Sequence, residues 1–355
     1  MSDASPSDQR PPAPSTPDPS ATDPSTTEQV STTGAGSSAG GDDREAFHRV
    51  RSEVAKAVVG QDGAVTGLLV ALLTGGHVLL EGVPGVAKTL LVRSLAASLS
   101  LDSKRVQFTP DLMPGDVTGS VVYDAESASF VFRNGPVFTN LLLADEINRT
   151  PPKTQASLLE AMEERQVSAD GTTMPLPDPF LVAATQNPIE YEGTYTLPEA
   201  QLDRFLLKLV LDIPDRDAEF EVLRRHAGGF DPRELGEAGI HAVLDAEGVR
   251  RARHRVREVG AGPDVLAYIV DLARATRQSP SVRLGVSPRG ATALLAAAKA
   301  YAWLGGYDAI TPDHVQAMAP AAWRHRLQLR PEAELEGVST DGILRSVLQQ
   351  VQVPL

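Results

Sequence analysis

Two separated segments constrain the fold of this chain more strongly than any other part of its sequence. Residues 77–89 read as an apolar strand, a Gly/Pro turn and the start of a helix. Residues 141–146 form a second apolar strand, which ends in Asp145 and Glu146. A Gly-rich turn between a strand and a helix binds phosphate through its backbone N–H groups, and a carboxylate nearby can hold Mg²⁺. Together the two segments predict a site for a nucleoside triphosphate.

The Gly/Pro turn has the residues that a phosphate loop needs, with one exception. Gly82 and Gly85 permit backbone conformations that direct N–H groups toward an anion. Lys88 is expected to reach the β- and γ-phosphates, and Thr89 to offer its hydroxyl to Mg²⁺. Ala87 stands where the strict pattern has glycine, so the position of the loop between a strand and a helix is its main support. The residues predicted to bind the phosphates are Gly82, Val83, Pro84, Gly85, Val86, Ala87, Lys88, Thr89 and Leu90.

Polar side chains follow two of the predicted strands. Asp145 is expected to hold Mg²⁺, and Glu146 to polarise the attacking water as a general base. Asn187 follows the next apolar strand and could orient the same water, although an Asn-Pro turn is the alternative. Buried parallel strands present such groups at their carboxyl ends, so we expect all three to lie together.

Two arginines are candidates for stabilising the transition state. Arg204 directly precedes a strand, and an arginine supplied by a neighbouring subunit can stabilise charge on the transferred phosphoryl group. Arg289 begins a later helix and is predicted to reach the γ-phosphate across a cleft between two domains. The alternatives are a surface ion pair of Arg204 with Asp203 or Glu199, and an ordinary first-turn arginine at position 289.

Strand and helix patterns alternate up to Pro214, which predicts a parallel sheet flanked by helices. Strands are expected at 77–80, 105–108, 140–144, 180–185 and 205–211, and helices at 44–58, 64–73, 88–99 and 152–164. Hairpins are expected at 120–133 and 166–176. Helices are expected after Pro214 at 215–226, 248–259, 265–277, 288–304 and 312–327. The prediction is an α/β nucleotide-binding domain at 44–213 and a small α-helical domain at 214–355.

Residues 1–43 are rich in Ser, Thr and Pro and have little to bury, so we expect a disordered acidic tail. Asp42 or Asp43 is the expected cap of the first helix. The tail contributes −6 of the net charge of −13, which leaves −7 for the folded part. This balance argues against non-specific binding of nucleic acid.

Composition narrows the function further. The chain has no cysteine, which excludes thiolate chemistry and fits a reducing compartment. No apolar run is long enough to span a bilayer and the first residues are polar, so a cytoplasmic location without membrane insertion is expected. The histidines show no paired metal spacing, so no catalytic transition metal is expected. The basic run 250–257 is interpreted as the solvated face of an amphipathic helix, and Trp303 and Trp323 as core or interdomain packing.

With these residues in place, the chain resembles AAA+ ATPases of the MoxR type over residues 44–330. The matching stretches are 58–61, 81–89, 107–112, 145–149, 184–188, 193–205 and 287–289. The resemblance implies that Val59 and Gln61 lie beside the adenine, that Asn187 and Arg289 are the first and second sensors, and that Arg204 is the arginine finger. Arg149 remains another candidate for the finger.

The resemblance also implies the biological setting. Members form hexameric rings that bind ATP and Mg²⁺ and act as chaperone-like motors on protein clients, often with a von Willebrand factor A domain. Two other functions stay open. One is a related AAA+ motor, such as a metal-chelatase motor subunit or a DNA-associated motor. The other is a scaffold that binds ATP without hydrolysing it.

Overall fold

The computed structural model describes residues 38–126, 128–169, 171–187 and 195–354, which belong to one compact unit. Most of the predicted tail, residues 1–37, lies outside the described part, as do residues 188–194. The predicted helix cap is wrong, because α1 (Ser38–Ala55) begins before Asp42 and Asp43. Asp43 is buried inside this helix and accepts a hydrogen bond from Arg251 at 2.9 Å.

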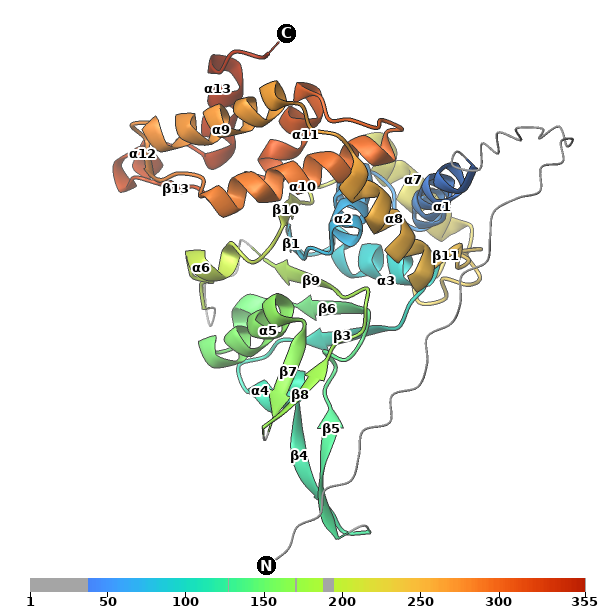
Figure 1. The fold of residues 1–355 in the computed structure, drawn as a ribbon. Helices are drawn as coiled ribbons and strands as arrows, with labels where there is room; N and C mark the ends of the chain where they lie inside the picture. Colours follow the sequence, from blue (N-terminus) through green and yellow to red (C-terminus); the bar gives the residue numbers. More distant parts are fainter. Residues whose placement is uncertain (1–37, 127, 170, 188–194, 355) are drawn as a thin grey trace, which may run out of the picture. The chain divides into compact units, whose positions relative to one another are not determined.

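A five-stranded parallel sheet forms the centre of the molecule, in the order β10–β1–β9–β6–β3 (Figure 1). Its strands are β1 (Val78–Glu81), β3 (Ser103–Gln107), β6 (Leu141–Asp145), β9 (Leu181–Gln186) and β10 (Leu207–Val210). All five lie close to the predicted strands. Because they are parallel, every strand ends at one edge, the carboxyl edge, and begins at the opposite one, the amino edge.

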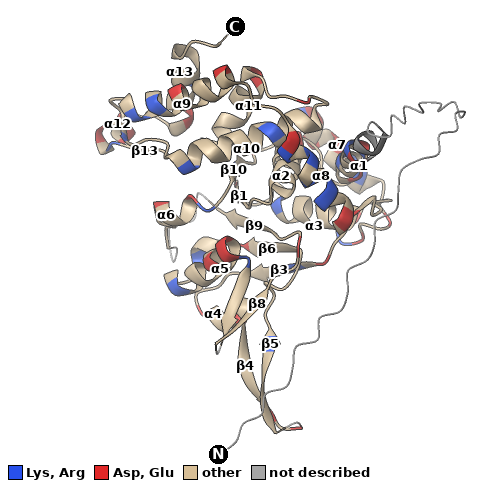
Figure 2. Cartoon of the chain, in the orientation of Figure 1, with Lys and Arg blue, Asp and Glu red and all other residues tan. Residues whose placement is uncertain are grey.

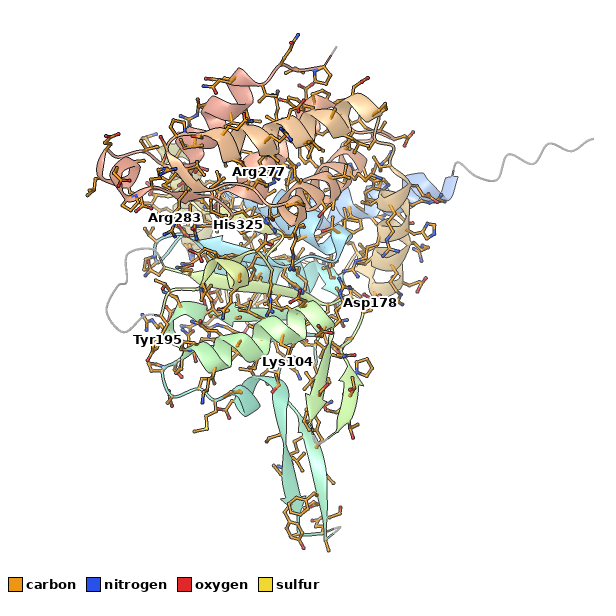
Figure 3. The ribbon with its side chains drawn as sticks, turned by 60° about the vertical axis from the view of Figure 1, so that its left-hand side comes forward. Lys104, Asp178, Tyr195, Arg277, Arg283 and His325 are labelled. Atoms are coloured by element: carbon orange, nitrogen blue, oxygen red, sulfur yellow. The ribbon has the colours of Figure 1, made fainter. Side chains whose placement is uncertain are left out.

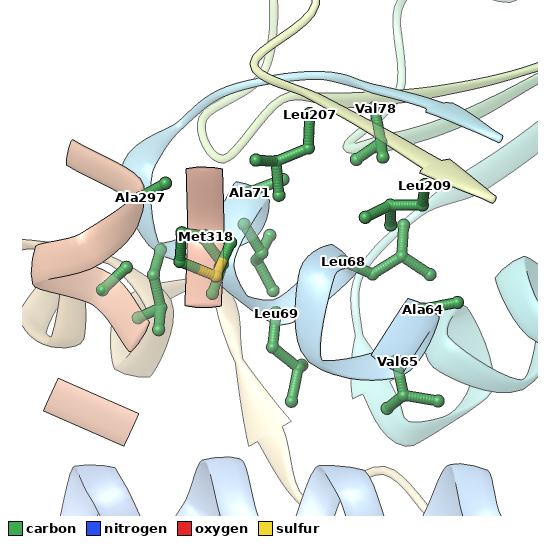
Figure 4. Packing of buried hydrophobic residues seen from close by; sticks show 14 of the residues in the cluster. Ala64, Val65, Leu68, Leu69, Ala71, Val78, Leu207, Leu209, Ala297 and Met318 are labelled. Carbon is green, nitrogen blue, oxygen red and sulfur yellow. The ribbon is translucent and has the colours of Figure 1, made fainter. Parts of the chain in front are cut away.

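Alternate residues of each strand pack on opposite faces of the sheet, as the period of two in a strand requires. Val78 and Leu80 share a hydrophobic cluster with α2 and α3, whereas Leu79 packs in a separate cluster with α5. The covering helices are α2 (Asp62–Thr74), α3 (Lys88–Ser98) and α5 (Pro152–Glu164). Figure 4 shows side chains of α2 packed against Leu207 and Leu209 of β10. The predicted parallel sheet flanked by helices is therefore confirmed.

Both predicted hairpins are present. The first follows the short helix α4 (Pro114–Thr118) and consists of β4 (Gly119–Asp124) and β5 (Ser129–Asn134), which project away from the sheet (Figures 1 and 3). Near its tip the exposed rings of Tyr123 and Phe130 stack edge to face, with centroids 5.4 Å apart. The second hairpin consists of β7 (Gln166–Ala169) and β8 (Thr172–Pro175).

The chain after β10 is mainly helical, as predicted. Its helices are α7 (Arg216–Ala227), α8 (Ala246–Glu258), α9 (Pro263–Gln278), α10 (Pro288–Leu304), α11 (Pro312–Trp323), α12 (Pro331–Leu335) and α13 (Thr340–Gln350). Short elements without a sequence signal are β2 (Leu99–Ser100), η1 (Ile147–Arg149), α6 (Glu199–Leu202), β11 (Leu244–Asp245), β12 (Val282–Leu284) and β13 (Gln328–Leu329). Helix α11 ends at Trp323, earlier than predicted, and a turn leads from it into β13, which pairs with β12. Among the described helices, none is long and apolar enough to cross a membrane.

The helical segment and the sheet share one hydrophobic cluster that runs from α2 into α10 and α11. Trp323 is fully buried and donates its indole N–H to Gly290 O at 2.8 Å, while Trp303 stacks edge to face on Phe47 of α1. The predicted packing role of both tryptophans is confirmed. A division of the chain at residues 213/214 stays a prediction, since the buried cluster continues across it.

Helix α8 confirms the interpretation of the basic run as a solvated face for Arg250, Arg251 and Arg257, which are exposed, and corrects it for Arg253. Arg253 is buried and donates to Leu72 O and to Asp178 Oδ1, each at 2.7 Å. Arg250 donates to Asp178 O at 2.7 Å, and Arg251 pairs with Asp43. The arginines therefore fasten α8 to α1, to α2 and to the segment before β9, while the apolar face of α8 is buried as its spacing indicated.

A buried histidine makes the stability of this fold sensitive to acid. His77, next to β1, accepts a hydrogen bond from Val182 N at Nδ1 and contacts Met162 O through Nε2 at 3.1 Å. Burial disfavours its charged form and lowers the pKa of His77 from 6.5 to about 4. In the unfolded chain the histidine takes up its proton near pH 6.5, so acid favours unfolding.

We therefore expect His77 to lower the free energy of unfolding by up to about 3 kcal/mol as the pH drops from 6.5 to 4. Urea unfolding at a series of pH values measures this slope. A His77→Gln protein should show a shallower slope in that window, whereas His254→Gln, at an exposed histidine, should match the wild type. An unchanged slope in His77→Gln would contradict the assignment.

Candidate nucleotide site

The phosphate loop connects β1 to α3 at the carboxyl edge, and its backbone explains the residues that it contains. A Cβ atom at Gly82 would come within 2.6 Å of Leu211 O, so only glycine fits there. Gly85 has φ = 90° and Ala87 has φ = 66°, both in the left-handed region. That region costs an alanine roughly 1 kcal/mol, which explains why glycine is the usual residue at position 87. The loop thus carries backbone strain next to the phosphate site.

Lys88 folds back over the loop that precedes it. Its ammonium group donates to Gly82 O at 2.6 Å and lies 3.4 Å from Gln186 O at the end of β9. It lines a cavity of about 780 Å³ at the carboxyl edge. The predicted residues that line this cavity are Val59, Gln61, Pro84, Gly85, Val86, Ala87, Lys88, Thr89, Leu90, Asp145, Glu146 and Asn187. Gly82 and Val83 support the loop without lining the cavity.

Several apolar side chains line the cavity away from the phosphate loop and suit the faces of a nucleobase. Val58 and Val59 form one wall, and α7 with the segment after it forms the other, including Leu223 and Phe230. Gln61 is buried, and its amide donates to Asp212 O at 3.0 Å, which ties this wall to the end of β10. A larger hollow of about 1010 Å³ lies between α2, β10 and α11, but the phosphate loop does not line it.

Two oxygen atoms at the carboxyl edge suit a magnesium ion. Thr89 Oγ1 lies 3.4 Å from Asp145 Oδ2, so one cation could contact both oxygens. Thr185 fixes this carboxylate, because its hydroxyl donates to Asp145 Oδ1 at 2.5 Å and accepts from Glu146 N at 2.9 Å. Mg²⁺ usually takes one or two protein oxygens and completes its shell with water and phosphate. The donor set therefore fits Mg²⁺ bound together with a nucleotide.

Neighbouring side chains hold both acids of the carboxylate pair. Gln107 Nε2 donates to Glu146 Oε2 at 2.5 Å, and Arg149 Nε lies 3.2 Å from the same oxygen. Arg105 donates to Asp145 Oδ2 at 2.8 Å. The sequence interpretation assigned no role to Gln107, Arg105 or Thr185. Alternation along β3 could have indicated the first two, since residues 105 and 107 share a face of the strand that pairs with β6.

Arg204 and Arg289 lie far from this cavity, at the amino edge of the sheet. They line a separate cavity of about 310 Å³ together with His77 and Leu206, which precede β1 and β10. The length of β1 places the two edges about 13 Å apart along this strand. Arg204 therefore points away from the nucleotide cavity of its own chain.

The placement of Arg289 corrects a prediction. It was expected to reach the γ-phosphate across a cleft within its own chain, but it pairs with Glu163 and Asp203 at the amino edge. The reason is that Glu163, near the end of α5, and Asp203, before β10, hold its guanidinium group there. Arg149, by contrast, lies at the carboxyl edge, where it contacts Glu146 in the nucleotide site of its own chain.

This fold and this site define a class of protein. The strand order, a phosphate loop after β1, an acidic pair after β6 and a helical segment after β10 are those of an AAA+ ATPase. Residues 77–207 match the family model described as "ATPase family associated with various cellular activities (AAA)", and residues 274–347 match the AAA lid domain.

Individual relatives show the family. The chain is 41% identical to Chaperone MoxR1 of Mycobacterium tuberculosis, over 87% of this chain and 82% of the relative. It is 52% identical to the uncharacterized protein YeaC of Bacillus subtilis, over 81% and 88% of the two chains. A crystal structure from Cytophaga hutchinsonii superposes with a TM-score of 0.81 at 40% identity, covering 89% of this chain and 97% of that one. The chain belongs to the MoxR family of AAA+ ATPases, and its activity is ATP hydrolysis.

Proposed function

We propose that this chain is one subunit of a hexameric ring in which ATP bound to one subunit is hydrolysed with the help of the next. The observation that carries the proposal is the separation of the functional residues between two edges of the sheet. The phosphate loop and Glu146 lie at the carboxyl edge, whereas Arg204 and Arg289 lie at the amino edge. Head-to-tail contacts in a ring bring unlike surfaces of neighbouring subunits together. In such a ring, Arg204 and Arg289 of one subunit would complete the nucleotide site of its neighbour.

Each residue then has a definite role. Lys88 and the loop N–H groups hold the phosphates, and Thr89 and Asp145 would hold Mg²⁺, which when bound neutralises charge on the β- and γ-phosphates. Glu146 accepts a proton from the attacking water, and Asn187 helps to orient that water. Val59 and Gln61 lie at the adenine end. Arg204, rather than Arg149, is the finger, because Arg149 lies inside its own site.

The proposed clients are proteins, with von Willebrand factor A-domain proteins as the expected class. The relative named Chaperone MoxR1 supports protein remodelling as the work driven by hydrolysis. The exposed aromatic pair Tyr123 and Phe130 on the β4–β5 hairpin supports it too, since exposed aromatic surface often marks a protein contact. In this proposal hydrolysis changes the angle between the helical segment and the sheet and so moves the hairpins. A cytoplasmic location accords with the lack of cysteine.

Steady-state ATP hydrolysis across a range of protein concentrations tests the shared site. Specific activity should rise with protein concentration and reach a plateau as rings form, and removal of Mg²⁺ by a chelator should abolish it. Analytical ultracentrifugation at the same concentrations should show the oligomer appear over the same range. Specific activity that is independent of concentration in a monomeric protein would contradict the proposal.

A second candidate is a motor that is inactive until its client binds. The contacts of Arg105 with Asp145 and of Gln107 with Glu146 favour it, because both acids are held by side chains of their own chain. Rings that form but hydrolyse ATP only after a client is added would support this second candidate. Rings that hydrolyse ATP at the same rate with and without a client would contradict it.

A further inference from the structure

One carboxylate at the amino edge holds both arginines that the proposed function assigns to the neighbouring site. Glu163, near the end of α5, places Oε2 2.9 Å from Arg204 Nε and Oε1 3.3 Å from Arg289 Nη1. Arg204 belongs to the segment before β10, whereas Arg289 belongs to α10. One acid therefore bridges two guanidinium groups from the sheet part and the helical part of the chain.

The bridge is part of a chain of alternating charges that starts from a buried arginine and continues through partly exposed residues. Arg326 is almost fully buried and donates to Asp203 Oδ1 at 2.6 Å, and Asp203 Oδ2 lies 3.7 Å from Arg289 Nε. Arg289 is about half exposed, and Glu163 is exposed over 36% of its side chain. In Figure 2 the charged segments of α5, α6 and the adjoining end of α10 lie on the same side of the molecule. The buried Arg326–Asp203 pair is therefore fixed, whereas Arg204 and Arg289 can exchange Glu163 for another anion.

The charges lining this cavity favour an added anion. Four arginines line it, against two carboxylates. These six residues are Glu163, Arg165, Asp203, Arg204, Arg289 and Arg326. A terminal phosphate has more negative charge and more acceptor oxygens than a carboxylate, and it accepts strong hydrogen bonds from guanidinium groups. Such a phosphate could take both arginines from Glu163.

We propose that Glu163 competes with the γ-phosphate of the neighbouring subunit's ATP for Arg204 and Arg289. In a free subunit Glu163 occupies both guanidinium groups. When a neighbour presents a triphosphate, the γ-phosphate replaces Glu163 as the partner of Arg204 and Arg289. A diphosphate lacks that group, so Glu163 keeps the arginines and the contact between subunits stays weak. Glu163 thereby weakens the contact that a triphosphate makes between subunits and so raises the protein concentration at which rings form, and the inference rests on the ring proposed above.

The test is assembly of the full-length protein with Mg²⁺ and either AMP-PNP or ADP, measured by sedimentation velocity over a range of protein concentrations. Glu163→Gln removes the negative charge and keeps the shape of the side chain. Because partly exposed ion pairs are worth little, we expect half-assembly with AMP-PNP at roughly threefold to tenfold lower concentration than for the wild type. Assembly with ADP should not change, so the preference for AMP-PNP over ADP should grow by the same factor. Glu164→Gln, the same change at the next exposed residue of α5, should behave as the wild type does.

The opposite result separates this role from a purely structural one. If Glu163 only held the arginines in position, Glu163→Gln would weaken assembly with AMP-PNP, which would overturn the inference. A midpoint with AMP-PNP equal to that of the wild type would overturn it too. A wild-type protein that assembles with neither nucleotide would instead overturn the ring itself. The failure of each proposal is therefore recognisable.

Discussion

A Glu146→Gln protein is expected to bind ATP normally and to lose roughly 10²- to 10⁴-fold in turnover, the range typical of removing a general base. The amide keeps the size of the side chain and can still accept the hydrogen bond from Gln107. It cannot take up the proton of the attacking water. The backbone at position 146, at φ = 59°, is held by Thr185 and should not change. The loss should therefore appear in kcat and not in nucleotide affinity.

Single-turnover hydrolysis and fluorescent-nucleotide binding, measured side by side, separate these two quantities. Glu332→Gln makes the same chemical change at an exposed position of α12 and should leave both unaltered. A Glu146→Gln protein that hydrolysed ATP at the wild-type rate would remove Glu146 from the role of general base. A protein that no longer bound ATP would show that position 146 acts in binding instead.

The second large effect is expected from Arg204→Ala, which should lower turnover by about 10³-fold, the lower limit typical of an arginine finger. The nucleotide cavity of the variant chain stays intact, because residue 204 lies at the opposite edge of the sheet. ATP affinity measured at low protein concentration should thus equal that of the wild type. Arg216→Ala, at an arginine with a largely exposed side chain, is the matched control and should retain full activity.

Mixing the two inactive proteins provides the sharpest test of a shared site. An Arg204→Ala subunit has an intact Glu146, and a Glu146→Gln neighbour has an intact Arg204. In equal mixtures about a quarter of the head-to-tail contacts would combine both intact residues, so activity should return to a substantial fraction of the wild type. If both residues serve the same chain, the mixture would stay as inactive as its components.

Local signals accounted for most of the elements and for the nucleotide cavity. The alternation of apolar strands with helical periodicity identified the five strands of the sheet, and α5 lies at the residues predicted for it. The Gly/Pro turn identified the phosphate loop, and the acids at the end of β6 lie beside it as expected. These signals can be read from the sequence because each depends on residues close together in the chain.

Contacts between distant segments could not be read in the same way. Arg253 has the appearance of a solvated residue in an amphipathic helix, yet it is buried against α2 and Asp178. Gln107 looks like an ordinary strand residue, yet β3 pairs with β6 and thereby brings it to Glu146. Each contact depends on which elements become neighbours in space, a property that no short pattern contains.

By itself the sequence determined that this chain binds a nucleoside triphosphate, since the strand–turn–helix loop and the acidic pair have their chemistry in consecutive residues. Only the tertiary structure decided where Arg204 and Arg289 lie. The sheet order and the ion pairs of Arg289 with Glu163 and Asp203 place Arg204 and Arg289 at the amino edge, joined by Glu163. The physical reason is that a parallel strand holds the residues before it and the residues after it at opposite edges of the sheet. Residues at opposite edges can meet at one phosphate only between two copies of the chain.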